Sequence, residues 1–502
     1  MADTKREIER KYESDDSGLP DLTGVAGVAA VIDKGVACLD ATYYDTADER
    51  LAASAITLRR RTGGSDAGWH LKFPVAPGVR DEIQAPLSDT VPRTLAGLVR
   101  SRVREAELLP VVRLRSDRDV RDLVDADGQL LAEVSVDAVH AERLGGDGAT
   151  AQWTEMEVEL ADGGDPAFLD KVDKRLRKTG VRPSKSASKL ARALAETAPK
   201  KKGKKKQQQA KDPVTAGDHV LAYVRQQRDA IVELDPAVRQ DVFDSVHRMR
   251  VATRRMRSAF RSYGKVLDRT VTDPIGEELK WLAGELGVDR DHEVLTERLT
   301  AALGELPRTL VSGPIRTRLR MWMNARRGGS RRRLTGVLDS RRYLTLLDSL
   351  DALVEDPPLL EAAAGKPEKV ITKVVRKDFG KLSGLVEQAI ELEPGQDRDL
   401  ALHEARKKAK RTRYAAEAAA PALGGSATAL VKSMKSLQGL LGDHQDSVMT
   451  RQTLRELSAV AHAAGESSFT YGVLYGREEQ RAAAVEAALP AAWAETAGGM
   501  EV

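Results

Sequence analysis

The sequence predicts a two-domain α+β protein, in which an antiparallel β domain precedes an all-α domain. Period-two alternation of apolar and polar residues dominates before residue 199, and a helical composition rich in Ala, Leu, Arg and Glu dominates after residue 212. Between them lies a segment whose one apolar residue, apart from a proline, is Ala210. With 502 residues, the chain also exceeds what one hydrophobic core normally supports.

The first domain, residues 1–198, is expected to be built mainly from strands. Turn clusters such as Gly-Gly-Ser-Asp-Ala-Gly at 63–68 separate many of the alternating segments. Helices are expected at 22–37, 91–104 and 166–179. The alternation predicts strands at 5–13, 56–61, 69–73, 80–85, 110–116, 120–125, 130–138 and 153–160.

Residues 199–212 contain the run KKKGKKKQQQAK, which cannot bury a core and predicts a flexible basic linker. Residues 213–490 form the expected helical domain, and 491–502 a tail. The helical part repeats: His247-Arg248-Met249-Arg250 returns as His403-Glu404-Ala405-Arg406, and Leu286-Gly287 returns as Leu441-Gly442. Two features that recur in order predict two similar helical bundles.

The composition limits the function. The net charge of +4 is small beside 80 basic and 76 acidic residues, so the placement of charge matters more than its total. Aromatic residues make up 4%, which argues against recognition of nucleic-acid bases by stacking. The single cysteine, Cys38, suits a reducing compartment. The charged N-terminus and the absence of a spanning apolar run predict a cytoplasmic protein without a membrane partner.

The segment at 5–13 places charge on one face of a strand. Glu7, Glu9, Lys11 and Glu13 share that face, and other predicted strands carry alternating acids or alternating arginines. An open sheet with one solvated face would account for any single strand. Like charges clustered on neighbouring strands repel, however. A closed barrel whose interior binds a polyanion and a divalent cation would neutralise both sets.

Carboxylates without His or Cys among them favour a hard cation such as Mg²⁺ or Mn²⁺. Such a cation commonly joins protein carboxylates to substrate phosphates, and phosphoryl transfer needs little beyond positioning, neutralised charge and an oriented water. The sequence therefore favours chemistry on a phosphate compound.

An ordered set of motifs runs through about residues 1–198: Glu7-x-Glu9-x-Lys11, Tyr43-Tyr44-Asp45-Thr46, Leu58-Arg59-Arg60-Arg61, Lys72, Arg80-x-Glu82, Glu155-x-Glu157-x-Glu159 and Ser188-Lys189. This set resembles the CYTH family, the triphosphate tunnel metalloenzymes. The resemblance implies an eight-stranded closed tunnel that hydrolyses or cyclises triphosphates or polyphosphates with a divalent metal. Adenylate cyclisation and hydrolysis of thiamine triphosphate stay open beside inorganic triphosphate, as does a tunnel that only binds its ligand.

Carried over by position, the resemblance implies roles for individual residues. Glu9 and Lys11 would be catalytic. The metal would be held by Glu7, Glu9, Glu155 and Glu157. Phosphate oxygens would be bound by Lys11, Arg59, Arg61, Lys72, Arg80, Arg113, Arg115 and Lys189. Arg118 is out of phase with Arg113 and Arg115 unless the strand bends at Ser116-Asp117.

The repeated helical segments each carry a basic face. His247, Arg250, Arg254 and Arg257 fall within about 80° of arc on a helix, and His403, Arg406, Lys410 and Arg413 occupy the same positions in the second copy. Solvated helix faces usually mix charges of both signs, and these stretches carry no acid on that face. Such faces suit a phosphate chain, because Arg presents planar forks of donors. Nucleic acid is the competing partner.

The second half resembles the CHAD domain, the conserved-histidine α-helical module, most closely at Leu402-His403-Glu404-Ala405-Arg406, Arg413-Tyr414 and Leu440-Leu441-Gly442-Asp443. The resemblance covers about residues 213–490. It implies two four-helix bundles that bind inorganic polyphosphate along a basic groove, with granules of that polymer as a further partner. The two copies differ where Arg290 in the first corresponds to Gln445 in the second.

Overall fold

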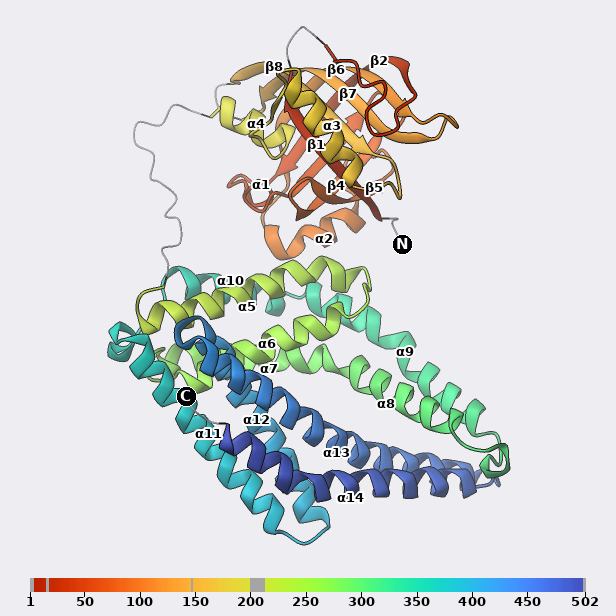
Figure 1. Cartoon of the computed structure of the whole chain (residues 1–502), viewed down its shortest axis with the longest axis vertical. Helices are drawn as coiled ribbons and strands as arrows, with labels where there is room; N and C mark the ends of the chain where they lie inside the picture. The colour runs from red at the N-terminus through yellow and green to blue at the C-terminus, as the bar shows by residue number, and fades with distance from the viewer. Residues whose placement is uncertain (1–3, 15–17, 146–147, 199–212, 500–502) are drawn as a thin grey trace. The chain divides into compact units, whose positions relative to one another are not determined.

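The computed structural model describes residues 4–14, 18–145, 148–198 and 213–499, with side chains at all of them except 288–293 and 325–330. The chain divides into two compact units, one before and one after the predicted linker at 199–212, which lies outside the described residues (Figure 1). The predicted two-domain layout, β domain first and α domain second, is confirmed.

In the described part of the first unit, eight antiparallel strands form a closed barrel. Around the barrel the order is β5-β4-β3-β2-β6-β7-β8-β1, and pairing of β1 with β5 closes it. The strands are β1 (Thr4–Glu13), β2 (Ala30–Asp45), β3 (Thr57–Thr62), β4 (Gly68–Ala76), β5 (Val79–Ala85), β6 (Leu109–Val124), β7 (Leu130–Arg143) and β8 (Thr150–Leu160). A two-residue strand, β9 (Arg182–Pro183), also pairs with β1.

Two sequence-based expectations about these strands are wrong. The helix expected at 22–37 is absent from the described residues, and β2 begins at Ala30 instead. Its many β-branched and aromatic residues favour a strand, and Gly35, with φ of +84°, provides the irregularity that the pairing with β6 requires. The two strands expected at 110–116 and 120–125 are one continuous strand, β6, which bears on the direction of its arginines.

Helices pack on the outside of the barrel and across one end of its interior. The helices are α1 (Arg50–Ala53), α2 (Arg93–Val103), α3 (Ala167–Lys178) and α4 (Lys189–Glu196). The buried face of α3 packs on residues such as Tyr12 and Val158, and that of α2 packs on Leu58 and Leu71. Because apolar side chains of these strands face the covering helices, the alternate side chains face the interior.

The second unit is helical. Its helices are α5 (Ala216–Arg239), α6 (Ser245–Ser262), α7 (Arg269–Glu285), α8 (Gly287–Gly304), α9 (Ile315–Asp339), α10 (Arg341–Glu355), α11 (Pro367–Glu391), α12 (Gln396–Leu423), α13 (Gly425–Ala463) and α14 (Phe469–Gly498), with short 3₁₀ turns η1 (Arg308–Leu310) and η2 (Glu361–Ala364). No helix among the described residues is long and apolar enough to cross a membrane.

The repeat seen in the sequence corresponds to the halves α5–α10 and α11–α14. Helix α6 carries the first basic segment and α12 the second, and Leu441-Gly442 lies within the long α13 where Leu286-Gly287 joins α7 to α8. The halves share one large core, to which Met249 and Met256 of α6 and Ala405 and Ala409 of α12 contribute. This shared core explains how the two basic helices come into contact.

Candidate functional site

The barrel interior contains a cavity of about 640 Å³. Its lining is strongly charged and comes from all eight barrel strands and the start of α4. Among the lining residues are Lys5, Glu7, Glu9, Lys11, Tyr43, Arg59, Arg61, Lys72, Arg80, Glu82, Arg118, Glu133, Glu157, Glu159 and Lys189. The expectation that the charged face of the first strand looks into a cavity is therefore met.

Lysines separate the carboxylates inside the barrel. Lys11 contacts Glu157 on the neighbouring strand and lies 3.2 Å from Glu9 Oε1, measured from Nζ. Burial lowers the pKa of Lys11, but the charges of Glu157 and Glu9 outweigh it, so that the net shift is upward. Lys11 is thus held as a cation, which suits contact with phosphate oxygens.

Lys189 also separates carboxylates, on the other side of Glu157. Ser188 caps α4 by accepting a hydrogen bond from the Ala191 amide at 3.0 Å, which fixes Lys189 in the first turn. The Lys189 ammonium then lies 2.7 Å from Glu157, 2.8 Å from Glu155 and 3.1 Å from Asp137. The Ser-Lys pair noted in the sequence therefore places the ammonium group of Lys189 in the cavity.

The arginine side of the cavity is less well neutralised. Arg59 donates to the Tyr43 hydroxyl at 3.3 Å, and Arg61 pairs with Asp66, whose side chain is 43% exposed. Burial, together with the neighbouring guanidinium groups of Arg59 and Arg118, lowers the pKa of Arg61 to about 9. Positive charge is therefore in excess on this side, where an anionic ligand would be stabilised.

A hydrogen-bonded chain supports the neighbouring part of the wall, on β1, β4 and β5. Glu7 accepts from Lys72 at 2.6 Å, and buried His70 lies 2.7 Å from Glu82 Oε1 and 2.9 Å from the carbonyl oxygen of Asp66. Burial raises the pKa of Glu7 to about 7, against the charge of Lys72. No pattern in the sequence singles out His70, because a lone histidine in a strand is not distinctive.

The expectation that Arg113 and Arg115 face the tunnel is wrong. Arg113 pairs with Asp40 and Arg115 lies 3.6 Å from Glu142, and both side chains are about half exposed. The pairing of β6 with β2 runs without a shift from Arg113 to Arg118, so Arg118 points to the other face, into the cavity. There it binds Asp137 through two contacts of 2.9 Å and Glu157 at 3.2 Å.

Glu155 also departs from its expected position. It is buried but does not line the cavity, and its carboxylate contacts the Trp153 indole N–H at 2.6 Å as well as Lys189. Glu13, which the sequence places on the same face as Glu9, accepts from Arg192 of α4 at 2.8 Å. Of the four expected metal ligands, the cavity surface presents Glu7, Glu9 and Glu157, with Glu159 as a further carboxylate.

These carboxylates fit a hard divalent cation by their chemistry, because all are oxygen donors and Glu9 lies directly opposite Glu159 on the paired strand. The fit has a condition. Lys11, Lys72 and Lys189 form ion pairs with these carboxylates in this structure, so a divalent cation has to displace the lysine ammonium groups. A substrate with several phosphate oxygens gives the displaced ammonium groups new partners.

In the second unit, the basic faces of α6 and α12 converge. Burial and the charges of Arg406, Arg254 and Arg250 lower the pKa of Lys410 to about 7. Arg250 and Arg254 belong to the first repeat, whereas Arg406 and Lys410 belong to the second. We refer to these four residues as the basic cluster. Its cations repel one another, and Asp446 lies 3.9 Å from Arg406.

The repeated Leu-Gly segments make room for the basic cluster. A Cβ at Gly287 would lie 2.8 Å from Arg250 Nη2, and one at Gly442 would lie 3.2 Å from Arg406 Nη2. The leucines before them are buried in the core. Each repeat therefore uses Leu to anchor a helix and Gly to let a guanidinium group lie against it.

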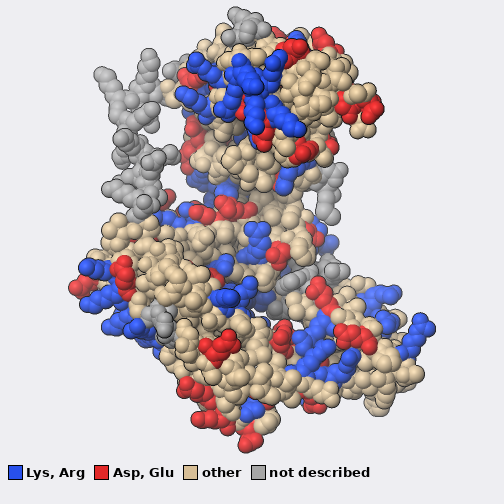
Figure 2. Space-filling model, in the orientation of Figure 1, with Lys and Arg blue, Asp and Glu red and all other residues tan. Residues whose placement is uncertain are grey.

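The remaining predicted polyphosphate-binding residues are placed differently. His403 Nδ1 lies 2.6 Å from Gln445 Oε1. Arg413 Nε lies 3.1 Å from Glu417, one turn further along α12, so the basic face of this helix ends beside an acid. Burial and the charges of Arg261 and Arg254 lower the pKa of Arg257. His247 is exposed near the start of α6, and the side chain of Arg290 lies outside the described residues. On the face drawn in Figure 2, basic and acidic groups are interspersed over both units.

Comparison with known proteins agrees with this architecture. The family model for the CYTH domain matches residues 5–194, and that for the CHAD domain matches residues 222–455. "Uncharacterized protein Rv2226" of Mycobacterium tuberculosis (strain ATCC 25618 / H37Rv) is 39% identical over 489 residues, which are 94% of this chain and 92% of the relative. CYTH members are metal-dependent tunnel enzymes, triphosphatases and cyclases among them. The chain belongs to the proteins that join a CYTH domain to a CHAD domain.

Solved structures with similar folds include "PptA from Streptomyces chartreusis", which is 20% identical with a TM-score of 0.47 and covers 56% of this chain and 99% of that chain. The CHAD domain from the plant Ricinus communis is 25% identical with a TM-score of 0.43, over 57% of this chain and 95% of that chain.

Proposed function

We propose that the first unit hydrolyses inorganic triphosphate, or a related triphosphate, with Mg²⁺ or Mn²⁺ as cofactor. The observation that supports this most is the group of arginines on one side of the cavity, where burial and the charges of Arg59 and Arg118 lower the pKa of Arg61 to about 9. A triphosphate carries negative charge that would neutralise this side of the cavity, and one guanidinium group can bind two phosphate oxygens at once. The cavity volume also lies in the range of small-ligand sites, about 300–1,000 Å³.

The residues divide the task between them. Arg59, Arg61, Arg80 and Arg118 would bind the phosphate chain, while Lys11, Lys72 and Lys189 would exchange carboxylate partners for phosphate oxygens. Glu7, Glu9 and Glu157, with Glu159, would hold the cation. A bound divalent cation would neutralise phosphate oxygens and lower the barrier to attack by water. The closed barrel limits the bulk water around the bound substrate.

A substrate panel with the full chain tests this proposal. Inorganic triphosphate, ATP and thiamine triphosphate are each incubated with Mg²⁺ or Mn²⁺, and phosphate and cyclic AMP are measured. We expect phosphate release from triphosphate that is lost in Glu9→Ala and Lys11→Ala and kept in Arg113→Ala, whose side chain lies outside the cavity. Absence of turnover with every metal would leave a tunnel that only binds its ligand, and cyclic AMP would indicate a cyclase.

We further propose that the basic cluster of the second unit binds inorganic polyphosphate in the cytoplasm, including polyphosphate granules. The supporting observation is the convergence of Arg250, Arg254, Arg406 and Lys410 from both repeats. Binding of long-chain polyphosphate by the full chain is compared with binding of single-stranded and duplex DNA at equal phosphate concentration. Preference for DNA would favour the nucleic-acid alternative.

A further inference from the structure

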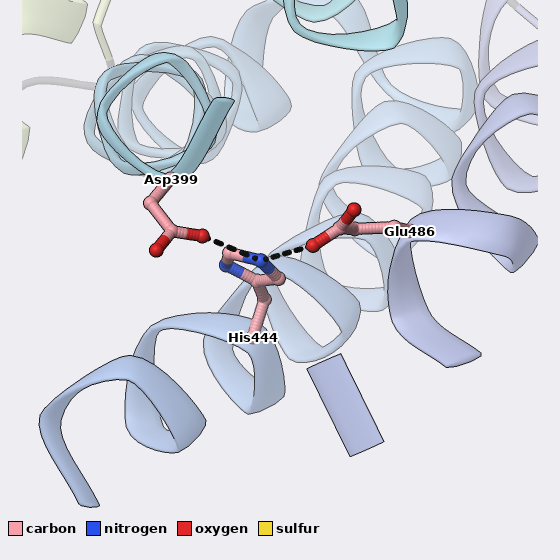
Figure 3. Close-up of side chains that lie close together, drawn as sticks. All are labelled: Asp399, His444 and Glu486. Carbon is pink, nitrogen blue, oxygen red and sulfur yellow. Dashed lines mark hydrogen bonds and ion pairs between the residues drawn. The ribbon is translucent and has the colours of Figure 1, made fainter. Parts of the chain in front are cut away.

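A second group of metal-ligand side chains lies in the helical unit, apart from the residues discussed so far. His444 of α13 is 1% exposed by its side chain, and its Nε2 lies 3.1 Å from Glu486 Oε1 of α14 and 3.3 Å from Asp399 Oδ1 of α12 (Figure 3). In the part of the chain that the structure describes, no other three His, Cys, Asp or Glu donors lie within 4.8 Å of one another.

The spacing of these atoms suits the ligands of one cation. Zinc lies about 2.0–2.2 Å from histidine nitrogen and carboxylate oxygen, so neighbouring ligands in a tetrahedral or octahedral shell are about 3.0–3.4 Å apart. The two contacts of His444 Nε2 fall in this range. An imidazole that donates one proton to two carboxylates would give similar distances, so the donor set has to be tested with metal.

The outer oxygens of both carboxylates are held by arginines. Arg398 Nη1 donates to Glu486 Oε2 at 2.9 Å, and Arg451 Nη2 donates to Asp399 Oδ2 at 3.4 Å. These bonds leave the inner oxygens directed at His444, as the outer partners of metal ligands commonly do. Their positive charge weakens attraction for a cation, so we expect weaker binding than at a structural zinc site.

The first repeat has no equivalent group. With the offset that relates His247 to His403, Asp399 corresponds to Phe243, and with the offset of the Leu-Gly segments, His444 corresponds to Asp289. The three side chains are therefore a feature of the second repeat and not a consequence of the shared fold.

We propose that Asp399, His444 and Glu486 bind a divalent transition-metal ion, with Zn²⁺ or Mn²⁺ as the class that an imidazole and two carboxylates suit. The ion fastens α12, α13 and α14 together. It also fixes α13 beside Gln445, the residue next to His444, which contacts His403. The site does not depend on the activity of the barrel.

The test is zinc binding by the full chain after removal of metals, in millimolar Mg²⁺ that occupies oxygen-only sites such as those of the barrel. Competition with a chromophoric chelator gives affinity and stoichiometry. We expect one Zn²⁺ per chain at a site whose affinity falls more than about tenfold in Asp399→Asn, Glu486→Gln and His444→Gln. Zinc should also raise the melting temperature of the unmodified chain but not of Asp399→Asn.

Two variants are matched controls. Asp397→Asn removes an exposed carboxylate two residues from Asp399, and Glu9→Gln removes one in the barrel; neither should change this zinc binding. Absence of stoichiometric zinc on the unmodified chain overturns the proposal, even if His444→Gln fails to fold. Equal zinc affinity in the unmodified chain, Asp399→Asn and Glu486→Gln overturns it as well.

Discussion

At the scale of single residues, substitution of Arg61 should lower activity without lowering stability. Its guanidinium group is repelled by Arg59 and Arg118, and its carboxylate partner Asp66 is well solvated. We expect Arg61→Ala to lower kcat/KM for triphosphate by roughly 10- to 100-fold, the value of a charge-assisted hydrogen bond, without lowering the melting temperature. Steady-state phosphate release and calorimetry measure the two quantities.

Arg60 is the matched control, because it lies between Arg59 and Arg61 on β3. Its side chain points away from the cavity and donates to the Ser88 carbonyl oxygen at 3.1 Å. Arg60→Ala should keep kcat/KM within about twofold, since the side chain is remote from the cavity. Equal losses of activity in both variants would contradict the assignment of Arg61 to the site.

We expect the proposed binding of polyphosphate to depend on pH through Lys410. Because its pKa is lowered to about 7, Lys410 is protonated below pH 7 and loses its charge above it. A polyanion favours the protonated form, so affinity should fall as the pH rises through 7, by roughly 3- to 30-fold between pH 6 and 8.5. Equilibrium binding at constant ionic strength measures this slope.

Lys410→Arg is the control, because arginine stays charged throughout this range. It should bind with an affinity that changes little between pH 6 and 8.5. Histidines also commonly titrate near this range. An unchanged slope in Lys410→Arg would assign the pH dependence to a histidine of the second unit instead.

The residues that the sequence misplaced show what alternation cannot decide. On β1 the charged face is the interior one, whereas near the start of β6 the apolar Val112 and Leu114 fill the interior beneath α4, and Arg113 faces out. Both strands alternate equally well. Strand pairing over long sequence distances decides which face is inside, and position along the barrel axis decides whether the inward residues are charged or apolar.

At the scale of elements, the sequence predicted the closed barrel, its main strands and the repeated helices, since these rest on periodicity and on ordered motifs. It failed at the start of β2, where four alanines at 26, 29, 30 and 37 favour a helix, although Val31, Ile32 and Val36 favour a strand. The long pairing of β2 with β6 stabilises the strand there. Such tertiary pairing decides between conflicting local propensities.

The element-scale prediction concerns the glycine of α13 that accommodates Arg406. Gly442→Ala places a methyl group about 3.2 Å from the guanidinium group, which has to move. Alanine also favours the helix by about 1 kcal/mol. We therefore expect polyphosphate affinity to fall several-fold while the melting temperature stays equal or rises, as measured by binding titration and calorimetry.

Gly439, three residues earlier on α13, controls for the change in helix propensity. It is exposed, and a Cβ there would meet no atom within 4 Å. Gly439→Ala should raise the melting temperature without changing polyphosphate affinity. If both variants weakened binding equally, the loss would come from α13 as a whole and not from the position of Arg406.

At the scale of the whole molecule, each unit has its own hydrophobic cores. Leu71 is buried in a core of the barrel unit, and Leu347 is buried in the core shared by the helical repeats. Since each unit has hydrophobic cores of its own, calorimetry of the full chain should resolve two transitions, in contrast to the two-state unfolding of small domains. Leu71→Ala should lower the melting temperature of one transition and Leu347→Ala that of the other. The reason is that a buried Leu→Ala cavity reduces the free energy of unfolding by about 2–5 kcal/mol.

Addition of triphosphate with Mg²⁺ should raise the melting temperature of the transition that Leu71→Ala lowers, because a ligand stabilises the unit that binds it. A single transition lowered by both substitutions would instead mean that the units unfold together.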